Sequence, residues 1–111
     1  MLKKLNRLSK ERDFTKVFKK ARSFHGPNLT LKVVPNGNRA SRFGFVISNK
    51  INKRATRRNA IKRRLRAIVM DNLDVWGKGI DAIVMVKKDY SFPYQTADIR
   101  VELLSLLGKC R

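Results

Sequence analysis

Hydrophobic positions near the N-terminus recur at intervals of three and four residues. They are Phe14, Val17, Phe18 and Ala21. This spacing places all four on one side of a helix, which we expect over residues 10–21 with Ser9 as its N-cap. After Gly26-Pro27 the pattern changes, because apolar and polar residues alternate from 29 to 33 as they do in a strand with one buried face.

A turn-like sequence separates this strand from a second apolar segment. Residues 35–38 read Pro-Asn-Gly-Asn, which is typical of a turn, and residues 43–48 follow as Phe-Gly-Phe-Val-Ile-Ser. We therefore predict a β-hairpin in which residues 43–48 return beside residues 29–33. A short additional strand is expected over residues 22–25.

A longer helical pattern follows, and we predict a helix over residues 53–75 that is ended by Gly77 and Gly79. Its buried side is marked by Ile61, Leu65, Ile68, Val69, Asn72 and Trp76. Residues 80–87 then form a nearly continuous apolar run, which is typical of a strand covered on both faces.

A last helix is predicted over residues 93–107, with Gly108 as its stop. Its apolar positions are Ile99, Leu103, Leu106 and Leu107. This helix is the least charged element of the chain, so we assign it to stability.

The order of elements predicts one domain over residues 1–111, an α/β (α+β) two-layer sandwich of helices packed on a sheet. A length of 111 residues suits one core. No apolar run is long enough to span a membrane, and residues 1–12 are too polar for a signal peptide. The single cysteine, Cys110, cannot form an internal disulfide, which fits a reducing compartment, and we expect a cytoplasmic protein without a membrane partner.

Charge changes the picture from a generic domain to one that binds a polyanion. The chain has 27 Lys and Arg against 8 Asp and Glu, a formal net charge of +19. From Phe14 to Met70 there is no carboxylate at all, whereas the final part of the chain is neutral. A surface that needs charge only for solubility mixes the two signs, so this distribution favours nucleic acid as the partner.

The cationic residues are densest between Lys50 and Arg66, where arginine outnumbers lysine. The planar guanidinium matches phosphate with two parallel hydrogen bonds and stacks on bases, which an ammonium does less well. A solvated helix face is the alternative, but such a face normally interleaves glutamate. On a helical projection Arg58 falls on the buried line and Arg54 lies close to it, so we expect the first turns to project beyond the core.

Two aromatic residues have a second possible role beside the predicted core. Phe14 and Phe18 lie one turn apart among lysines, an arrangement that suits stacking on single-stranded nucleic acid. Their helical spacing alone favours the simpler interpretation that both rings are core residues. Thr30 and Lys32 lie on the opposite strand face from Leu31 and could line a cleft with the first helix.

The remaining polar residues offer no protein active site. His25 has no Cys or His at ligand spacing, so we interpret it as a loop histidine and predict no metal site. Asp71 and Asp74 are interpreted as charge balance at the end of the basic helix rather than as an acid–base pair. We predict no catalytic residue in the chain.

The motifs together resemble those of one family, the bacterial ribonuclease P protein subunit. Residues 57–66 read Arg-Arg-Asn-Ala-Ile-Lys-Arg-Arg-Leu-Arg, similar to that family's basic signature. Residues 43–50 look like its strand leading into the signature, and residues 12–18 resemble its first helix. The resemblance covers residues 5–108 in the right order.

The resemblance implies a protein cofactor of a ribozyme that removes the 5′ leader from precursor tRNA, with Mg²⁺ held mainly by the RNA subunit. It implies a ribosomal protein S5 domain 2-like fold with a mixed sheet, in which a left-handed β-α-β crossover carries the basic helix. The implied partners are the catalytic RNA and the precursor tRNA leader, with no obligate protein partner. The implied RNA-subunit contacts are Lys50, Arg54, Arg57, Arg58, Asn59, Lys62, Arg63 and Arg66. The implied leader cleft contains Phe14, Phe18 and Lys32.

Two positions depart from the family pattern. Ala60 stands where the signature usually has its second arginine, so one phosphate contact is absent or moves to Arg57 or Arg64. Lys32 occupies a strand position that is aromatic in some relatives. The alternative functions are a small structural ribosomal protein, which shares the size and charge, and a stand-alone nuclease, for which the catalytic residues are missing.

Overall fold

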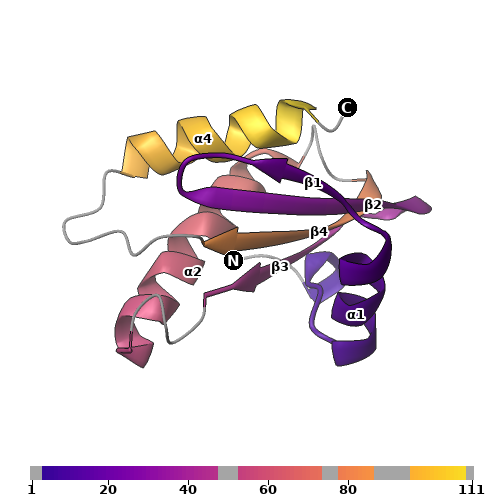
Figure 1. The fold of residues 1–111 in the computed structure, drawn as a ribbon, viewed down its shortest axis with the longest axis horizontal. Helices are drawn as coiled ribbons and strands as arrows, with labels where there is room; N and C mark the ends of the chain where they lie inside the picture. Colours follow the sequence, from indigo (N-terminus) through magenta and orange to yellow (C-terminus); the bar gives the residue numbers. More distant parts are fainter. Residues whose placement is uncertain (1–3, 48–52, 74–77, 87–95, 110–111) are drawn as a thin grey trace.

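The computed structural model describes residues 4–47, 53–73, 78–86 and 96–109, and its centre is one four-stranded sheet (Figure 1). The strands are β1 (Arg22–His25), β2 (Leu29–Ala40), β3 (Arg42–Val46) and β4 (Lys78–Val86). Their spatial order is β1-β2-β4-β3. β4 is antiparallel to β2 and parallel to β3, so the sheet is mixed.

The position of β4 in this strand order excludes the predicted hairpin between β2 and β3. Residues 81–84 are all buried, which confirms that the apolar run is a strand covered on both faces. Such a strand belongs in the middle of a sheet, and it separates β2 from β3 although these two are consecutive in sequence. The prediction that residues 43–48 pair with residues 29–33 is therefore wrong.

The turn predicted at residues 35–38 is also wrong, because β2 continues through them. The turn-forming residues instead produce a register shift between Pro35 and Ala40, with Gly37 at a φ of +74°. The Asn36 side chain donates hydrogen bonds to the backbone oxygens of Ala40 and Ile80 at 3.0 and 3.1 Å, which holds the irregular segment against β4. β2 ends at Ala40 and β3 begins at Arg42, with the buried Ser41 between them. The expected strand at residues 22–25 is present as β1.

One helix, α1 (Glu11–Lys20), packs on the face of the sheet that carries Ile83 and appears at the lower right in Figure 1. It begins one residue later than predicted. The amides of Asp13 and Phe14 donate to the carbonyl oxygen of Lys10 at 3.0 and 3.2 Å, so Lys10 and not Ser9 is the N-cap. Val17 is the buried residue of α1, and it packs in a small cluster with Leu8 and Ile83.

The other face of the sheet is covered by α2 (Ala55–Asp71) and α4 (Thr96–Lys109), which share the main core cluster. The predicted buried positions Ile61, Leu65, Ile68 and Val69 of α2 are confirmed, as are Ile99, Leu103, Leu106 and Leu107 of α4. None of the helices in the described residues is both long enough and apolar enough to cross a membrane.

The C-terminal ends of α2 and α4 both differ from the predictions. The α-helix α2 ends at Asp71, where the Asn72 side chain donates to the Ile68 carbonyl oxygen at 2.8 Å. Gly79 belongs to β4 and does not end the helix, while Trp76 and Gly77 lie outside the described residues. Gly108 is inside α4 rather than after it, because the neighbouring Lys109 continues the helix.

The chain passes from β3 through α2 to the parallel, adjacent β4, so the basic helix lies in a β-α-β crossover. The predicted α+β fold with a mixed sheet is confirmed. The left hand of the crossover stays a prediction of the family resemblance.

Candidate nucleic-acid interface

The basic helix α2 presents its cations outside the core. In the described segment these are Arg54, which precedes the helix, and Arg57, Arg58, Lys62, Arg63, Arg64 and Arg66 within it. Arg54 and Arg63 are exposed, and the other five are half-buried. The first turn contains no acidic residue, so the positive end of the helix dipole adds to the side-chain charge. This end of α2 is therefore suited to bind an anion.

The first turns of α2 project beyond the core, as predicted. Ile61 is the first buried residue of the helix, and each residue from 55 to 60 is either exposed or half-buried. Arg58 lies on the line of buried side chains but donates from Nη1 to the Lys53 carbonyl oxygen at 3.0 Å, which holds its guanidinium beside the helix start. Asn59 is exposed, and Ala60 is half-buried. Lys50 lies outside the described residues.

One flank of α2 reaches β3. The guanidinium carbon of Arg66 is 5.9 Å from the centre of the Phe45 ring, a distance at which a cation is attracted to the ring face. Lys62 lies one turn earlier on the same flank. The basic surface therefore continues from the helix start toward the edge of the sheet.

The predicted cleft residues Phe18 and Lys32 are brought together on the opposite side of the sheet. Phe18 is 44% exposed, and the Nζ of Lys32 is 6.0 Å from the centre of its ring. The same Nζ donates to the Ser23 Oγ at 2.9 Å. Phe18 is thus a surface ring with a cation beside it, and the interpretation of both phenylalanines as core residues fails for this one.

Phe14 occupies a different place from Phe18. It is half-buried and packs against the cluster of Leu8, Val17 and Ile83. A Cβ on Gly44 would lie only 2.5 Å from the Phe14 Cζ, so the ring reaches the surface of β3 because residue 44 is glycine. Phe14 therefore both packs α1 on the sheet and borders the surface near β3.

A polar network that the sequence analysis missed fixes α1 to the sheet. The Nη1 of Arg42 is 3.2 Å from the Asp13 Oδ2 in α1, and its Nη2 is 2.6 Å from the Asp81 Oδ2 in β4. Asn36 Nδ2 donates to the Asp81 Oδ1 at 3.0 Å. The one signal for this network was Asp81 itself, a carboxylate inside an apolar run that must have a partner when buried.

The network also shifts two ionisation equilibria. The hydrogen bond to Asp81 raises the pKa of the Arg42 guanidinium. Burial alone raises the pKa of Asp81, but the hydrogen bonds from Arg42 and Asn36, together with the charge of Arg42, outweigh it and leave that pKa below its usual value. Both groups are therefore charged at neutral pH.

The structure also places His25 and Asp71, two polar residues to which the sequence assigned no catalytic role. His25 belongs to β1 rather than to a loop, and its Nδ1 lies 3.4 Å from the Thr30 Oγ1. Asp71 forms an ion pair with Arg100 of α4 at 3.4 Å, which agrees with charge balance. Asp74 lies outside the described residues.

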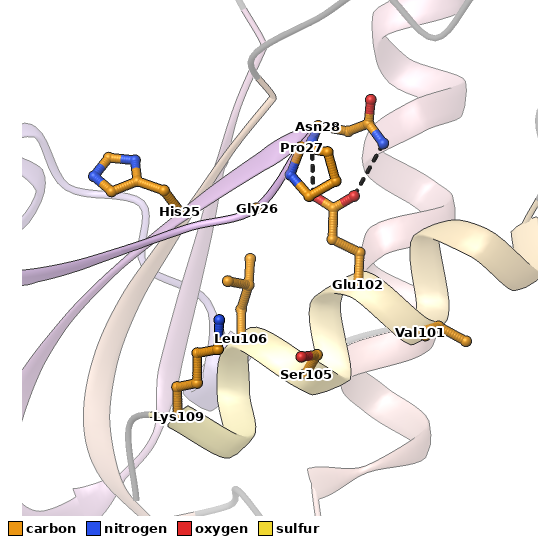
Figure 2. A pocket seen from close by; sticks show the side chains of 9 residues that line it. All are labelled: His25, Gly26, Pro27, Asn28, Val101, Glu102, Ser105, Leu106 and Lys109. Carbon is orange, nitrogen blue, oxygen red and sulfur yellow. Dashed lines mark hydrogen bonds between the residues drawn. The ribbon is translucent and has the colours of Figure 1, made fainter.

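A pocket of about 560 Å³ lies elsewhere, between the β1–β2 turn and α4 (Figure 2). Glu102 of α4 forms its wall and accepts hydrogen bonds from the Asn28 amide and side chain at 2.9 and 3.0 Å, and from the Leu29 amide. None of the predicted site residues that the structure describes lines this pocket, and its carboxylate makes it a poor place for a phosphate chain.

The fold and the two surfaces define a class: a small α+β protein with a basic helix, free of carboxylates up to its last residue Asp71, on one side of its sheet and an aromatic–cationic surface on the other. These features are typical of proteins that bind RNA. Comparison with known proteins identifies the family within this class. Residues 2–111 match the family model described as Ribonuclease P, and the chain belongs to the ribonuclease P protein family.

Individual relatives agree with this assignment along nearly the whole chain. The ribonuclease P protein component of Pseudanabaena sp. is 36% identical over 113 residues, which cover 100% of this chain and 96% of the relative. That of Thermotoga maritima is 38% identical over 106 residues, covering 93% and 90%. The solved structure of the Thermotoga maritima protein superimposes with a TM-score of 0.84 at 35% identity, covering 93% of this chain and 96% of that one.

Proposed function

We propose that this chain is the protein subunit of a ribonuclease P in which an RNA subunit performs the chemistry, and that it assists removal of the 5′ leader from precursor tRNA. Its partners are the catalytic RNA and the leader, in the cytoplasm, with no obligate protein partner. Family membership supports the role, and the two surfaces described above support a division of labour between them.

The RNA subunit binds the basic helix in this proposal. The contacts are made by Arg54, Arg57, Arg58, Asn59, Lys62, Arg63 and Arg66, together with Lys50. Their side chains are accessible along the described part of α2, and the absence of acidic residues in its first turn leaves phosphate as the natural counter-charge. Arg57 and Arg64 are both half-buried and flank the position where Ala60 replaces the usual arginine, so either can replace its contact.

The leader of the precursor tRNA binds the surface formed by Phe18 and Lys32, with Phe14 at its border. A single-stranded leader presents a phosphate for the Lys32 ammonium and a base for the exposed Phe18 ring, which lie 6.0 Å apart. The sequence-independent nature of both contacts suits a subunit that must accept many different leaders.

The protein itself supplies no reacting group in this proposal. Magnesium is implied by the family, but the donor set of this surface does not fit it, because Mg²⁺ is held through oxygen ligands and residues 14–70 contain no carboxylate. We therefore assign the magnesium ions to the RNA subunit. The chain's own side chains bind and orient RNA.

The observation that carries the proposal is the placement of the family's basic signature on the accessible side of α2. The test is cleavage of a precursor tRNA by a bacterial ribonuclease P RNA at low magnesium, with and without this protein. We expect correct 5′ maturation only when the protein is present, because it replaces counter-ions that the RNA otherwise needs.

No stimulation by a folded protein that still binds RNA tightly would contradict the proposal. Equal affinity for ribonuclease P RNA and for ribosomal RNA in the same experiment would then favour the structural ribosomal protein.

A further inference from the structure

A small pocket lies where the N-terminal segment passes along the edge strand β3. The Leu8 amide donates to the Phe43 carbonyl oxygen at 3.0 Å, and Arg7 forms a parallel bridge with the same residue. Between this segment, α1, β3 and α2 there is a pocket of about 220 Å³. It adjoins both surfaces described above, because Arg66 comes from the basic helix and Phe14 from the helix of the leader surface.

The chemistry of the pocket is that of a nucleotide site. Arg7 and Arg66 bring two guanidinium groups to it, and Phe14 and Phe45 bring two aromatic rings. Arg66 lies 5.9 Å from the Phe45 ring centre, so a cation and a ring are already neighbours there. Guanidinium groups bind phosphate, and rings stack on bases.

Gly44 lets the Phe14 ring approach the backbone of β3 at the border of the pocket. Gly44 lines the pocket, and a Cβ there would come within 2.5 Å of the Phe14 Cζ and 3.3 Å of the Leu8 carbonyl oxygen. A larger residue would push the Phe14 ring out of its position. The ring is therefore held at the pocket by the side-chain-free surface of β3.

The volume limits the occupant. About 220 Å³ is below the roughly 300–1,000 Å³ of pockets that enclose drug-sized ligands. It has room for part of one nucleotide, such as its base, with the rest of the unit in solvent, and not for a base-paired helix.

We propose that this pocket binds one unpaired ribonucleotide, with its phosphate on Arg7 and Arg66 and its base against Phe45, at the edge of β3 that Phe14 borders from the other face. The inference rests on the proposed function and extends it, since the nucleotide belongs either to the RNA subunit or to the leader. At the junction of the two surfaces, the pocket ties the RNA on α2 to the RNA beside α1.

The test uses two variants and one matched control in the full chain. Arg7→Gln removes a charge, Phe45→Leu removes a ring but keeps an apolar side chain, and Lys109→Gln removes an exposed charge from α4. For each protein we would measure affinity for ribonuclease P RNA, and then affinity of the assembled complex for precursor and mature tRNA.

We expect both pocket variants to lose about five-fold or more in one of these affinities, while the control changes less than about two-fold. The two losses have different signatures. Arg7→Gln lowers the slope of log K against log salt by about 0.7, whereas Phe45→Leu leaves that slope unchanged. If a variant loses affinity for the RNA subunit, the bound nucleotide belongs to that RNA. If the assembled complex loses affinity for precursor tRNA but not for mature tRNA, the bound nucleotide belongs to the leader.

The inference is overturned if both variants match Lys109→Gln in every affinity. If Phe45→Leu does not fold, Arg7→Gln decides alone, because it removes the charge: affinities and a salt slope equal to those of Lys109→Gln overturn the site.

Failure of the proposed function would look different. The unmodified protein would then not stimulate cleavage, whereas binding of a short single-stranded oligoribonucleotide would still shift the Gly44 amide resonance if the pocket exists. An unshifted Gly44 resonance at saturation would overturn the pocket on its own.

Discussion

At the scale of single residues, Phe18 shows how the chain separates packing from recognition. It shares a helical face with the buried Val17 and the half-buried Phe14, yet 44% of it is exposed beside the Lys32 ammonium. Its apolar surface is not needed for the core, since the small cluster beneath α1 closes without it. The ring is therefore available to RNA, and its removal should affect binding more than stability.

We predict that Phe18→Ala weakens binding of precursor tRNA to the assembled enzyme by about 1–3 kcal/mol, the value of one lost base–ring stack, and leaves mature tRNA unaffected. The measurement is a pair of binding titrations with the two tRNAs. Val101→Ala is the control, because Val101 is 68% exposed on α4 and lies outside both surfaces. Equal losses for both tRNAs would remove Phe18 from the leader surface.

Arg58 is the corresponding residue on the basic helix. We predict that Arg58→Ala weakens association with the RNA subunit and lowers the salt slope of that association by about 1, as expected for one phosphate contact. Lys109→Ala, at the end of α4, controls for the general loss of charge. An unchanged salt slope in the Arg58 variant would show that its guanidinium serves only the hydrogen bond to the Lys53 carbonyl oxygen.

At the scale of elements, α1 is held on the sheet by charge as well as by apolar contact. Arg42 bridges Asp13 of α1 and the buried Asp81 of β4. The folded-state pKa of Asp81 lies below its unfolded value. Stability from this pair is therefore complete above the unfolded pKa of about 3.9 and is lost as the pH falls through the lower folded value.

We predict that Arg42→Met destabilises the fold by about 1–3 kcal/mol at pH 7, because it leaves the Asp81 carboxylate buried without its main partner. The measurement is urea unfolding at pH 7 and at pH 3. The difference between variant and unmodified protein should shrink at low pH, since protonated Asp81 no longer needs the guanidinium. A difference that is the same at both pH values would contradict the linkage.

The contact between α1 and β3 depends on glycine. We predict that Gly44→Ala destabilises the protein by about 1–3 kcal/mol, because the new methyl group would overlap the Phe14 ring. Thermal or urea unfolding measures this, and Phe14→Leu in the same chain should recover part of the loss. A double variant no more stable than Gly44→Ala would mean that backbone, and not the ring, is the obstacle.

At the scale of the whole molecule, a net charge of +19 on 111 residues makes salt a sensitive variable. If about eight phosphates are neutralised, log K for RNA should fall with a slope of roughly −6 against log salt for single-stranded contacts. Filter binding or fluorescence titration over a range of salt concentrations measures this. A slope near zero would be incompatible with binding driven by phosphate.

How far the sequence predicts this molecule depends on whether a feature is local. The buried residues of α2 and α4 follow from helical spacing and are confirmed. The exposed start of α2 followed from the rule that an unpaired charge cannot remain in a core. The pairing of residues 43–48 was predicted wrongly, because a turn sequence reports only its own neighbourhood and β4 arrives from far along the chain.

The residues of the candidate surfaces also differ in whether the sequence alone reveals them. A continuous signature such as residues 57–66 is visible in the sequence because its members share one helix. The Arg42–Asp81 pair and the pocket that joins Arg7 to Arg66 combine residues from separate elements, so no spacing rule reveals them.

By itself, the sequence determined the order of helices and strands along the chain, where the apolar faces of the helices lie, and that the partner is a polyanion, because periodicity and charge are properties of neighbouring residues. The tertiary structure alone decided the strand order, the partner of each buried carboxylate, and the separation of Phe14 from Phe18. These depend on which distant segments compete for the centre of the sheet, where β4, buried on both faces, displaces the hairpin that the turn residues favour.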